Sequence, residues 1–412
     1  PKAAIAHGIG MGTQHFALAL PMTVTENIRV GAASSWALNM RAAQDEIAAA
    51  AARFGMVIDP AARIQHLSVG QRQRVEILKA LYRQARVLIL DEPTAVLTPQ
   101  EVDQLFTNLR HLQQNGLSVV FISHKLHEIM AITDRVTVLR SGRVIDSIAT
   151  RDATPHLLAQ MMVGREMVGV TRPSASPARR PILRLAHVTA LDRQGLLALK
   201  GITLDLHAGE IVGLAGVSGN GQTELAEVLD GTRRCVDGKI ELEGVELTNA
   251  SPRTVMSAGL GRIPEDRHAA VVGELSVAQN MALEHLDEFA QGGKLQHRAM
   301  RRHAETLIAA YQIKAQPEDR IRTLSGGNIQ KVILARVLER NPKAIVVAQP
   351  TRGLDIGATE YVRNKLMEQR SKGAAILLIS EDLDEILALA DRIAVIYEGQ
   401  IMGILPVAEA PQ

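Results

Sequence analysis

The sequence predicts an α/β protein built from two related domains, each with a mainly parallel sheet as its core. Short, wholly apolar runs such as residues 87–90 and 210–215 resemble strands that are buried on both faces of a parallel sheet. These runs alternate with amphipathic stretches that suit helices. An internal repeat predicts the two domains: LSVGQRQRVEILKAL at Leu67 is matched by LSGGNIQKVILARVL at Leu324, an offset of 257 residues.

Length and composition narrow the class of protein. A chain of 412 residues can form two domains with a core each. A net charge of +2 and an aromatic content of 2% argue against a nucleic-acid-binding surface. The single cysteine, Cys235, excludes an internal disulfide framework and fits a reducing compartment. The longest apolar runs, such as residues 374–379, are too short to span a membrane, so we expect any membrane role to come through a partner.

Polar residues that suit phosphate chemistry begin at residue 68 and recur in a fixed order. The turn Ser68-Val69-Gly70-Gln71 opens an amphipathic helix, and the free N–H groups at a helix start suit an anion. The apolar run at residues 87–90 then delivers Asp91 and Glu92 at its carboxyl end. An acidic pair at this position can serve Mg²⁺ and an attacking water.

A second predicted strand, residues 117–122, ends at Ser123 and His124. If this strand neighbours the 87–90 strand in one parallel sheet, the imidazole lies beside the acidic pair. Each element also has a purely structural interpretation, because LDEP can be a strand that runs into a turn and a histidine after a strand can be a satisfied polar residue. The order and spacing of all three elements favour the functional interpretation.

The same order of elements returns in the second half of the chain. The constant offset of 257 holds from the turn at residue 68 to the histidine at residue 124, which indicates a duplicated domain. The segments matched at this offset are Asp91-Glu92-Pro93-Thr94 with Ala348-Gln349-Pro350-Thr351, and Ser123-His124 with Ser380-Glu381. Nearer the start of each copy, GIGMGTQ matches GLGRIPE, which sets Gln14 against Glu265.

The second copy also carries a glycine-rich loop. Residues 182–206 are typical of paired β-strands, residues 210–215 of a buried strand, and GVSGNGQT follows from Gly216 to Thr223 at the start of a helix. Glycines in such a loop let backbone N–H groups close around phosphates, and Thr223 can reach Mg²⁺. A glycine-rich turn can be merely structural, but the order of strand, loop and helix favours phosphate binding. Gln222 stands where this loop pattern has a lysine.

Domain boundaries follow from composition. Residues 171–181, TRPSASPARRP, lack periodicity, and we expect a first domain over 1–165, a linker over 166–181 and a second domain over 182–412. In the first domain we expect a turn at residues 8–10 and then an extended piece that leads to residue 14. Helices are expected over 42–54, 98–114 and 125–131, the second of them opened by a capping box of Thr98 and Glu101 with proline at the first helical position.

The segments LSVGQ, LILDEPT and ISH at this spacing resemble the signature motif, the Walker B motif and the switch histidine of ABC-type ATPases. The whole chain is similar to the tandem ATPase subunits of bacterial simple-sugar and nucleoside importers. VEILKALYR, GVSGNGQT, IPEDRH and AQPTRGLDIGA resemble the nucleoside-type branch, which works with basic-membrane-protein-like binding proteins. The resemblance implies two P-loop NTPase domains with small helical subdomains, and the second has an additional antiparallel β subdomain. The first domain lacks a Walker A segment, so we expect an N-terminal truncation.

The resemblance also implies two composite sites for ATP and Mg²⁺, each formed by one domain's phosphate loop and the other domain's signature. Glu92 would polarise the attacking water, His124 would contact the γ-phosphate, and Gln14 would contact the water and the metal. Asp91, Gln14 and Thr223 are the implied metal contacts. The implied nucleotide-binding residues are Gly216, Ser218, Gly219, Asn220, Gly221, Gln222, Thr223, Ser68, Gly70, Gln71, Ser325, Gly326, Gly327 and Asn328.

The two implied sites differ in quality. At the second site Ala348, Gln349 and Glu381 replace the two acids and the histidine. A neutral amide cannot serve as a base near neutral pH, and an ionised carboxylate repels a γ-phosphate. We therefore expect the second site to hold nucleotide without efficient turnover. Because the first site has the acidic pair but lacks its phosphate loop, we expect the 412-residue chain by itself to be a weak or inactive ATPase.

The predicted function is that of an ATP-hydrolysing subunit that energises import of a nucleoside or simple sugar. Its partners would be membrane permease subunits and, indirectly, an extracytoplasmic solute-binding protein, and the subunit would lie on the cytoplasmic face of a bacterial plasma membrane. One alternative is a soluble twin-ABC protein that acts on ribosomes or DNA, although such proteins usually retain two competent sites. The other is a regulatory nucleotide-binding pseudo-ATPase.

Overall fold

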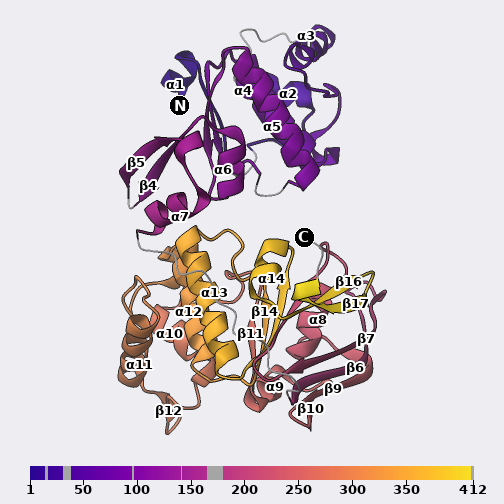
Figure 1. Cartoon of the computed structure of the whole chain (residues 1–412), viewed down its shortest axis with the longest axis vertical. Coiled ribbons are helices and arrows are strands. Elements are labelled where there is room, and N and C mark those ends of the chain that lie inside the picture. Colours follow the sequence, from indigo (N-terminus) through magenta and orange to yellow (C-terminus); the bar gives the residue numbers. More distant parts are fainter. Residues whose placement is uncertain (14–16, 31–38, 95–96, 141, 165–179, 410–412) are drawn as a thin grey trace. The chain divides into compact units, whose positions relative to one another are not determined.

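A computed structural model describes residues 1–13, 17–30, 39–94, 97–140, 142–164 and 180–409. The chain divides into two compact units, residues 1–167 (unit 1) and residues 168–412 (unit 2), which are coloured from indigo to magenta and from magenta to yellow in Figure 1. The first strand of unit 2 begins at Pro181, the last residue of the expected linker. The description below takes each unit by itself.

Unit 2 is built on a six-stranded sheet in the order β11-β14-β15-β8-β16-β17. The first five strands run parallel and only β17 is antiparallel to its neighbour. Every residue of β8 and β15 is buried, as expected for Val-, Ile- and Leu-rich strands that are covered on both faces. The strands are β8 (Ile211–Ala215), β11 (Leu260–Ile263), β14 (Ala344–Ala348), β15 (Ala375–Ser380), β16 (Arg392–Tyr397) and β17 (Gln400–Pro406).

The two faces of this sheet pack against different layers. Leu377 and Ile379 of β15 belong to a core shared with an antiparallel sheet of order β10-β9-β6-β7 and with the helix that follows β8. Ile376 and Leu378 pack instead into a core formed with the helices on the other face (Figure 1). The antiparallel β subdomain expected for the second domain is thus present. Its strands are β6 (Pro181–Leu191), β7 (Leu197–His207), β9 (Cys235–Leu242) and β10 (Val245–Glu246).

The helices of unit 2 connect the strands and form a small helical subdomain that carries the second signature segment. A two-stranded hairpin, β12 (Ala290–Gln291) and β13 (Lys294–Leu295), lies between two of these helices in the chain. The helices are α8 (Gln222–Leu229), α9 (Pro252–Ala258), α10 (Val277–Ala282), α11 (His297–Ala310), α12 (Gly326–Leu338), α13 (Ile356–Ser371) and α14 (Leu383–Leu389).

Unit 1 has a three-stranded parallel sheet, β1-β2-β3, and a separate hairpin, β4-β5. The expected helices are present within two residues of their predicted ends. The strands are β1 (Ile9–Gly12), β2 (Val87–Asp91), β3 (Ser118–Ile122), β4 (Arg135–Arg140) and β5 (Arg143–Ala149). The helices are α1 (Lys2–Ala6), α2 (Val24–Arg29), α3 (Met40–Arg53), α4 (Val69–Tyr82), α5 (Pro99–Gln114), α6 (Leu126–Ile132) and α7 (Pro155–Val163).

Two details of local structure test the expectations for unit 1. The capping box at the start of α5 forms as predicted, because the Thr98 hydroxyl accepts from the Glu101 N–H and the Glu101 carboxylate accepts from the Thr98 N–H. The turn expected over residues 8–10 is shorter than predicted. Only Gly8 is in the turn, with φ +78°, whereas Ile9 and Gly10 already pair with β2.

The internal repeat extends to strand register. In unit 1 Val87 of β2 pairs with Ile9 and with Ser118. In unit 2 Ala344, 257 residues further on, takes the same position between β11 and β15. The two units therefore share one backbone plan around these strands, which permits position-by-position comparison.

The expectation that residues 87–90 are buried on both faces is wrong. Leu88 and Leu90 are fully buried, but Val87 and Ile89 on the other face are only half-buried. In unit 2 the corresponding face is covered by the antiparallel sheet and α8, and β8 lies between β15 and β16. The described residues of unit 1 supply no such layer and no counterpart of β8. A groove of ≈ 1130 Å³ runs instead along β3 and β4.

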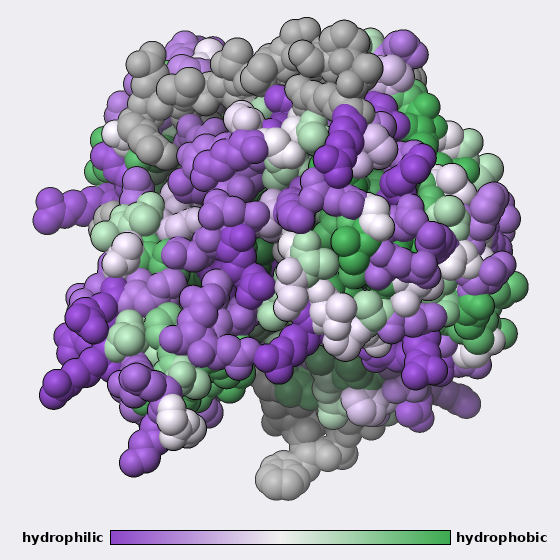
Figure 2. All heavy atoms as spheres, turned by 90° about the horizontal axis from the view of Figure 1, so that it is seen from below, coloured by the Kyte–Doolittle hydropathy of each residue, from purple (hydrophilic) through white to green (hydrophobic). Residues whose placement is uncertain are grey.

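The face of the protein shown in Figure 2 is mostly hydrophilic, with apolar residues in smaller separate areas. None of the helices in the described ranges is both long enough and apolar enough to cross a membrane.

Candidate functional site

The glycine-rich loop of unit 2 lies between the end of β8 at Ala215 and the start of α8 at Gln222. Gly219 and Gly221 have φ of +88° and +105°, which side chains with a Cβ rarely adopt. A Cβ on Gly221 would also lie 2.9 Å from the carbonyl oxygen of Ala198. The loop is therefore a compact turn that only glycine permits, placed at a helix N-terminus, where backbone N–H groups and the helix dipole favour a phosphate.

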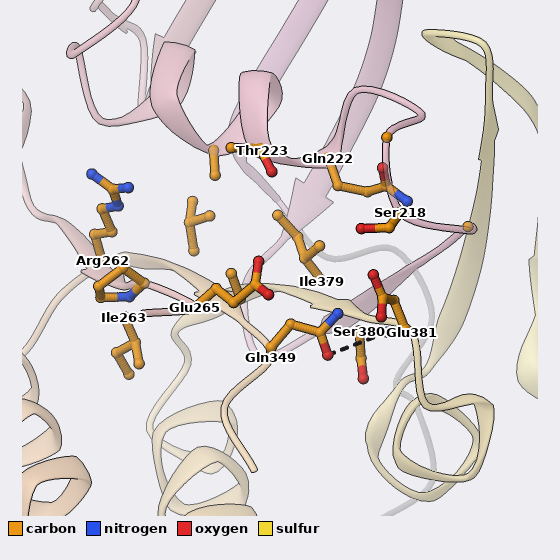
Figure 3. Close-up of a pocket in the computed structure, with 16 residues that line it drawn as sticks. Ser218, Gln222, Thr223, Arg262, Ile263, Glu265, Gln349, Ile379, Ser380 and Glu381 are labelled. Atoms are coloured by element: carbon orange, nitrogen blue, oxygen red, sulfur yellow. Dashed lines mark hydrogen bonds between the residues drawn. The ribbon is translucent and has the colours of Figure 1, made fainter. Parts of the chain in front are cut away.

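A cavity opens beside this loop and is shown in Figure 3. Ser218, Gln222 and Thr223 approach it from the loop and the first turn of α8, while Glu265 follows β11. Further lining residues come from the carboxyl ends of β14 and β15, the edge of a parallel sheet at which ligands usually bind. These residues are Ala348, Gln349, Ser380 and Glu381.

Gln222 does not extend into the cavity as a phosphate-binding lysine would. Its Oε1 accepts from the Asn220 N–H at 3.1 Å, and its Nε2 donates to the Val217 carbonyl at 3.0 Å. The side chain thus folds over its own loop and occupies one of the loop's N–H donors. A bound phosphate would have to displace at least this contact.

The three positions that carry acids and a histidine in the first copy have different chemistry in unit 2. Ala348 ends β14 without a carboxylate, and Gln349 follows it with its Oε1 3.4 Å from the Glu381 N–H (Figure 3). Glu265 forms an ion pair with Arg352. The cavity therefore offers phosphate-binding groups but no free acidic pair among the residues that line it.

Unit 1 brings together the acids and the histidine predicted from the sequence. β2 and β3 are parallel neighbours, and Asp91 ends β2. His124 Nδ1 lies 2.8 Å from Glu92 Oε1, and both side chains are about a quarter exposed. The Glu92 N–H donates to the Ile122 carbonyl at 2.9 Å, which ties the residue to the end of β3. The pair is thus in contact and still accessible to solvent.

The two signature turns each open a long helix but are held differently. Ser68 and Gln71 form a capping box at the start of α4, with bonds of 2.8 and 3.2 Å between side chain and backbone. In unit 2 Asn328 Nδ2 donates to Ser325 Oγ at 3.0 Å, and the Ser325 side chain makes no cap to the helix backbone. A Cβ on Gly70 would lie 2.4 Å from Glu101 Oε1, so a larger residue there would have to displace the Glu101 side chain.

Several residues that were predicted to bind nucleotide or metal do not line the cavity of unit 2. The residues Ser325, Gly326, Gly327 and Asn328 do not line the cavity of unit 2. Gln14 lies outside the described residues. Within the described ranges no group of three or more His, Cys, Asp and Glu side chains is arranged to hold a metal ion. Mg²⁺ usually binds to one or two protein groups together with phosphate oxygens, and the hydroxyl of Thr223 and the carboxylate of Asp91 fit that role.

Sequence reasoning missed three groups near these sites. No role was predicted for Arg352, which pairs with Glu265, or for Arg262, which lines the cavity and pairs with Asp230. A buried glutamate, Glu128, accepts a hydrogen bond from Ser123, the residue before His124. The repeat contains the signal for it, because Glu385 stands 257 residues later.

Comparison with known proteins matches both units to one family. The sequence profile described as "ABC transporter" matches residues 2–95 and 199–352. The chain is 44% identical to a glucose import ATP-binding protein of Haloferax volcanii and 43% identical to a nucleoside import ATP-binding protein of Lactococcus lactis. It is also 43% identical to a guanosine import ATP-binding protein of Bacillus subtilis. Each match covers 98% of this chain and 80 or 81% of the relative.

Proposed function

The chain belongs to the ABC transporter family, and we propose that it is the ATP-hydrolysing subunit of an importer for a nucleoside or a simple sugar. The observation that carries this proposal is the contact of 2.8 Å between Glu92 and His124 beside Asp91, at the carboxyl ends of two parallel strands. The names of the relatives, which are import ATP-binding proteins for glucose, nucleosides and guanosine, support the transport role.

Unit 1 is proposed to carry the hydrolytic chemistry. The Glu92 carboxylate would accept a proton from the attacking water, which is the role of a positioned general base. His124 would hold that carboxylate in place through Nδ1 and present its other ring nitrogen to the γ-phosphate. Bound ATP with Mg²⁺ would supply the transferable phosphoryl group and neutralise its charge, and Asp91 is proposed to hold the metal's water shell. Gln14 is proposed as a further contact to the metal and the water.

Unit 2 is proposed to bind nucleotide without efficient turnover. The glycine loop and Thr223 line one side of the cavity and suit phosphates. On the other side, the amide of Gln349 cannot accept the proton of a water, and Glu381 would place a negative charge near the γ-phosphate. Ala348 offers no ligand for a metal's water shell. Phosphate-binding groups without a general base support a site that holds nucleotide and hydrolyses it poorly.

The signature turns are proposed as further phosphate contacts, because each lies at the N-terminal end of a long helix. Their residues are Ser68, Gly70 and Gln71 in unit 1 and Ser325, Gly326, Gly327 and Asn328 in unit 2. We further propose a membrane permease as the direct partner, an extracytoplasmic solute-binding protein as an indirect one, and the cytoplasmic face of the plasma membrane as the location. Relatives named for solute import favour this over a twin-ABC protein that acts on ribosomes or DNA.

The test uses the full-length polypeptide with its permease and compares two substitutions at matched positions. Glu92→Gln should lower steady-state ATP turnover by about 10²–10⁴-fold, which is typical of losing a general base. Gln349→Glu should not raise turnover, because Ala348 and Glu381 remain. Nucleotide should stay bound to unit 2 in both variants. Near-normal turnover by Glu92→Gln, or robust turnover gained through Gln349→Glu, would contradict the assignment of catalysis to unit 1.

A further inference from the structure

A buried carboxylate in unit 1 bonds to both segments that carry the acid–histidine pair. Glu128 is only 1% exposed. Its Oε2 accepts from Thr94 Oγ1 at 2.7 Å and from Ser123 Oγ at 2.8 Å. Thr94 comes two residues after Glu92, and Ser123 directly precedes His124. One oxygen atom thus ties together the two loops that present the catalytic groups.

Unit 2 contains a similar arrangement at the same repeat positions, although there the two hydroxyls donate to different oxygens of the carboxylate. Glu385 is also 1% exposed and accepts from Thr351 Oγ1 at 2.7 Å and from Ser380 Oγ at 2.8 Å. Each of these three residues stands 257 positions after its counterpart in unit 1. The arrangement of one glutamate and two hydroxyls, here called the carboxylate bridge, is therefore present in both units.

The bridge acts on a backbone position that needs support. Glu92 has φ +45° and its counterpart Gln349 has φ +47°, in the left-handed region that residues with a side chain rarely adopt. Such a conformation costs of order 1–3 kcal/mol and persists only where surrounding contacts determine it. In unit 1 these contacts are the Glu92 N–H bond to Ile122 at 2.9 Å and the bridge through Thr94.

We propose that Glu128 is a positioning residue for ATP hydrolysis, which sets the Glu92–His124 contact by tying Thr94 to Ser123. This inference rests on the proposed function of unit 1. Glu128 does not touch the reacting atoms, so it acts only through the geometry of the two loops. A displacement of about 1 Å in a catalytic group can reduce a rate by about 10²-fold, which is the scale at which such a bridge matters.

The charge environment of the carboxylate differs between the two units. Burial penalises the charged form, and it raises the pKa of Glu385, with Asp382 nearby acting in the same direction. In unit 1 the position of Asp382 is taken by Lys125, whose Nζ lies 3.2 Å from Glu128 Oε1. The bridge in unit 1 therefore has a compensating cation, whereas the bridge in unit 2 lacks it at that position.

The two bridges form a matched pair for experiment, because only one of them holds groups that can perform the chemistry. Loss of Glu385 should loosen the loops of Gln349 and Glu381, neither of which is proposed to act in catalysis. The atoms involved also predict a conservative rescue. Both hydroxyls in unit 1 donate to the same oxygen of Glu128, so a glutamine can offer its single carbonyl oxygen to both. Its NH2 group would then replace the oxygen that pairs with Lys125, so the variant keeps the two arms of the bridge and loses only that ion pair.

The experiment measures kcat and KM for ATP in Glu128→Ala, Glu128→Gln and Glu385→Ala of the full-length polypeptide with its permease. Glu128→Ala should lower kcat by about 10–10²-fold with KM changed less than about threefold. Glu128→Gln should retain most of kcat. Glu385→Ala should leave kcat within about twofold, while thermal unfolding shows a loss of stability similar to that of Glu128→Ala.

An equal fall in kcat for Glu128→Ala and Glu385→Ala would overturn the proposal, because the effect would then be a general loss of stability. An unchanged kcat in Glu128→Ala would overturn it as well. Glu92→Gln, assayed in parallel, separates this inference from the function on which it rests: if that variant keeps its turnover, the catalytic assignment fails. If Glu128→Ala does not fold, Ser123→Ala removes one arm of the bridge, and a normal kcat in that variant would count against the proposal.

Discussion

In the part of the 412-residue chain that the structure describes, one face of the unit 1 sheet is uncovered, which leads to a stability prediction at two matched isoleucines. Ile122 of β3 is 45% exposed, whereas Ile379 of β15, at the same repeat position, is 4% exposed. Their neighbours show the same contrast, since Val120 is 48% exposed and Leu377 is fully buried. Both residues are isoleucines, and they occupy equivalent positions on equivalent strands. Replacement of each by alanine therefore isolates the effect of the layer that covers the sheet.

The expected magnitudes follow from the exposed fractions. Ile379→Ala removes buried atoms from an enclosed core and should lower the free energy of unfolding by about 2–5 kcal/mol. This loss combines the transfer free energy of the removed atoms with the cost of the cavity that they leave. Ile122→Ala removes about three CH₂ equivalents, worth ~0.8 kcal/mol each when fully buried, from a side chain that is covered over roughly half its surface. It also leaves no closed cavity. We therefore expect a cost of about 1 kcal/mol at Ile122.

The assay is hydrogen–deuterium exchange read by mass spectrometry across a urea series, because a chain of two units need not unfold in one transition. Peptides from α4 and β2 report on unit 1, and peptides from α12 and β14 report on unit 2. Leu88→Ala is the control: this side chain is fully buried against the covered face of the unit 1 sheet, so its loss should cost about 2–5 kcal/mol. Equal losses of unfolding free energy in Ile122→Ala and Ile379→Ala, with Leu88→Ala losing the expected amount, would contradict the inference that Ile122 lies on an uncovered face of the sheet.

Two further changes test unit 2. Gln222→Lys should tighten nucleotide binding by about fivefold in equilibrium titrations without restoring turnover, since a charge-assisted bond replaces a neutral one while Ala348 still provides no acid. Burial raises the pKa of Glu210, but bonds from Arg392 and His207 outweigh that effect and hold the pKa below its ordinary value. A lowered pKa stabilises the fold above the ordinary value of about 4.5 and loses that contribution as the pH falls. Glu210→Gln should therefore unfold more easily than the parent at pH 7, and the difference should shrink below about pH 4.5.

Elements that depend on nearby residues could be predicted from the sequence. The capping box of Thr98 and Glu101 needs only a turn of chain, and the helix it opens ends at the expected residue. Two apolar runs of strand length predicted β2 and β3, and their parallel pairing, which the sequence left as a condition, is present. That pairing was enough to place His124 beside Glu92, because parallel strands present their carboxyl ends at one edge of the sheet.

Features that depend on distant partners could not be predicted in this way. An apolar strand predicts burial, but the burial of Ile122 is decided by whether another layer packs on its face. The ion pair of Arg352 with Glu265 joins residues 87 positions apart that share no motif. The fold-back of Gln222 onto Val217 depends on loop geometry rather than on the identity of the residue that replaces lysine.

The comparison of the two units separates the scaffold of a catalytic site from its chemistry. Gln349 keeps the positive φ of Glu92 and the same backbone bond to the neighbouring strand, at 2.8 Å against 2.9 Å. The carboxylate bridge is also present in both units. What differs is the set of side chains that the scaffold presents: Ala348 and Gln349 in unit 2 replace the two acids of unit 1. A carboxylate restored at residue 349 would have a suitable backbone geometry, but it would lack the acidic neighbour and the histidine that Glu92 has. Hydrolysis is therefore expected to depend on the acids and the histidine of unit 1.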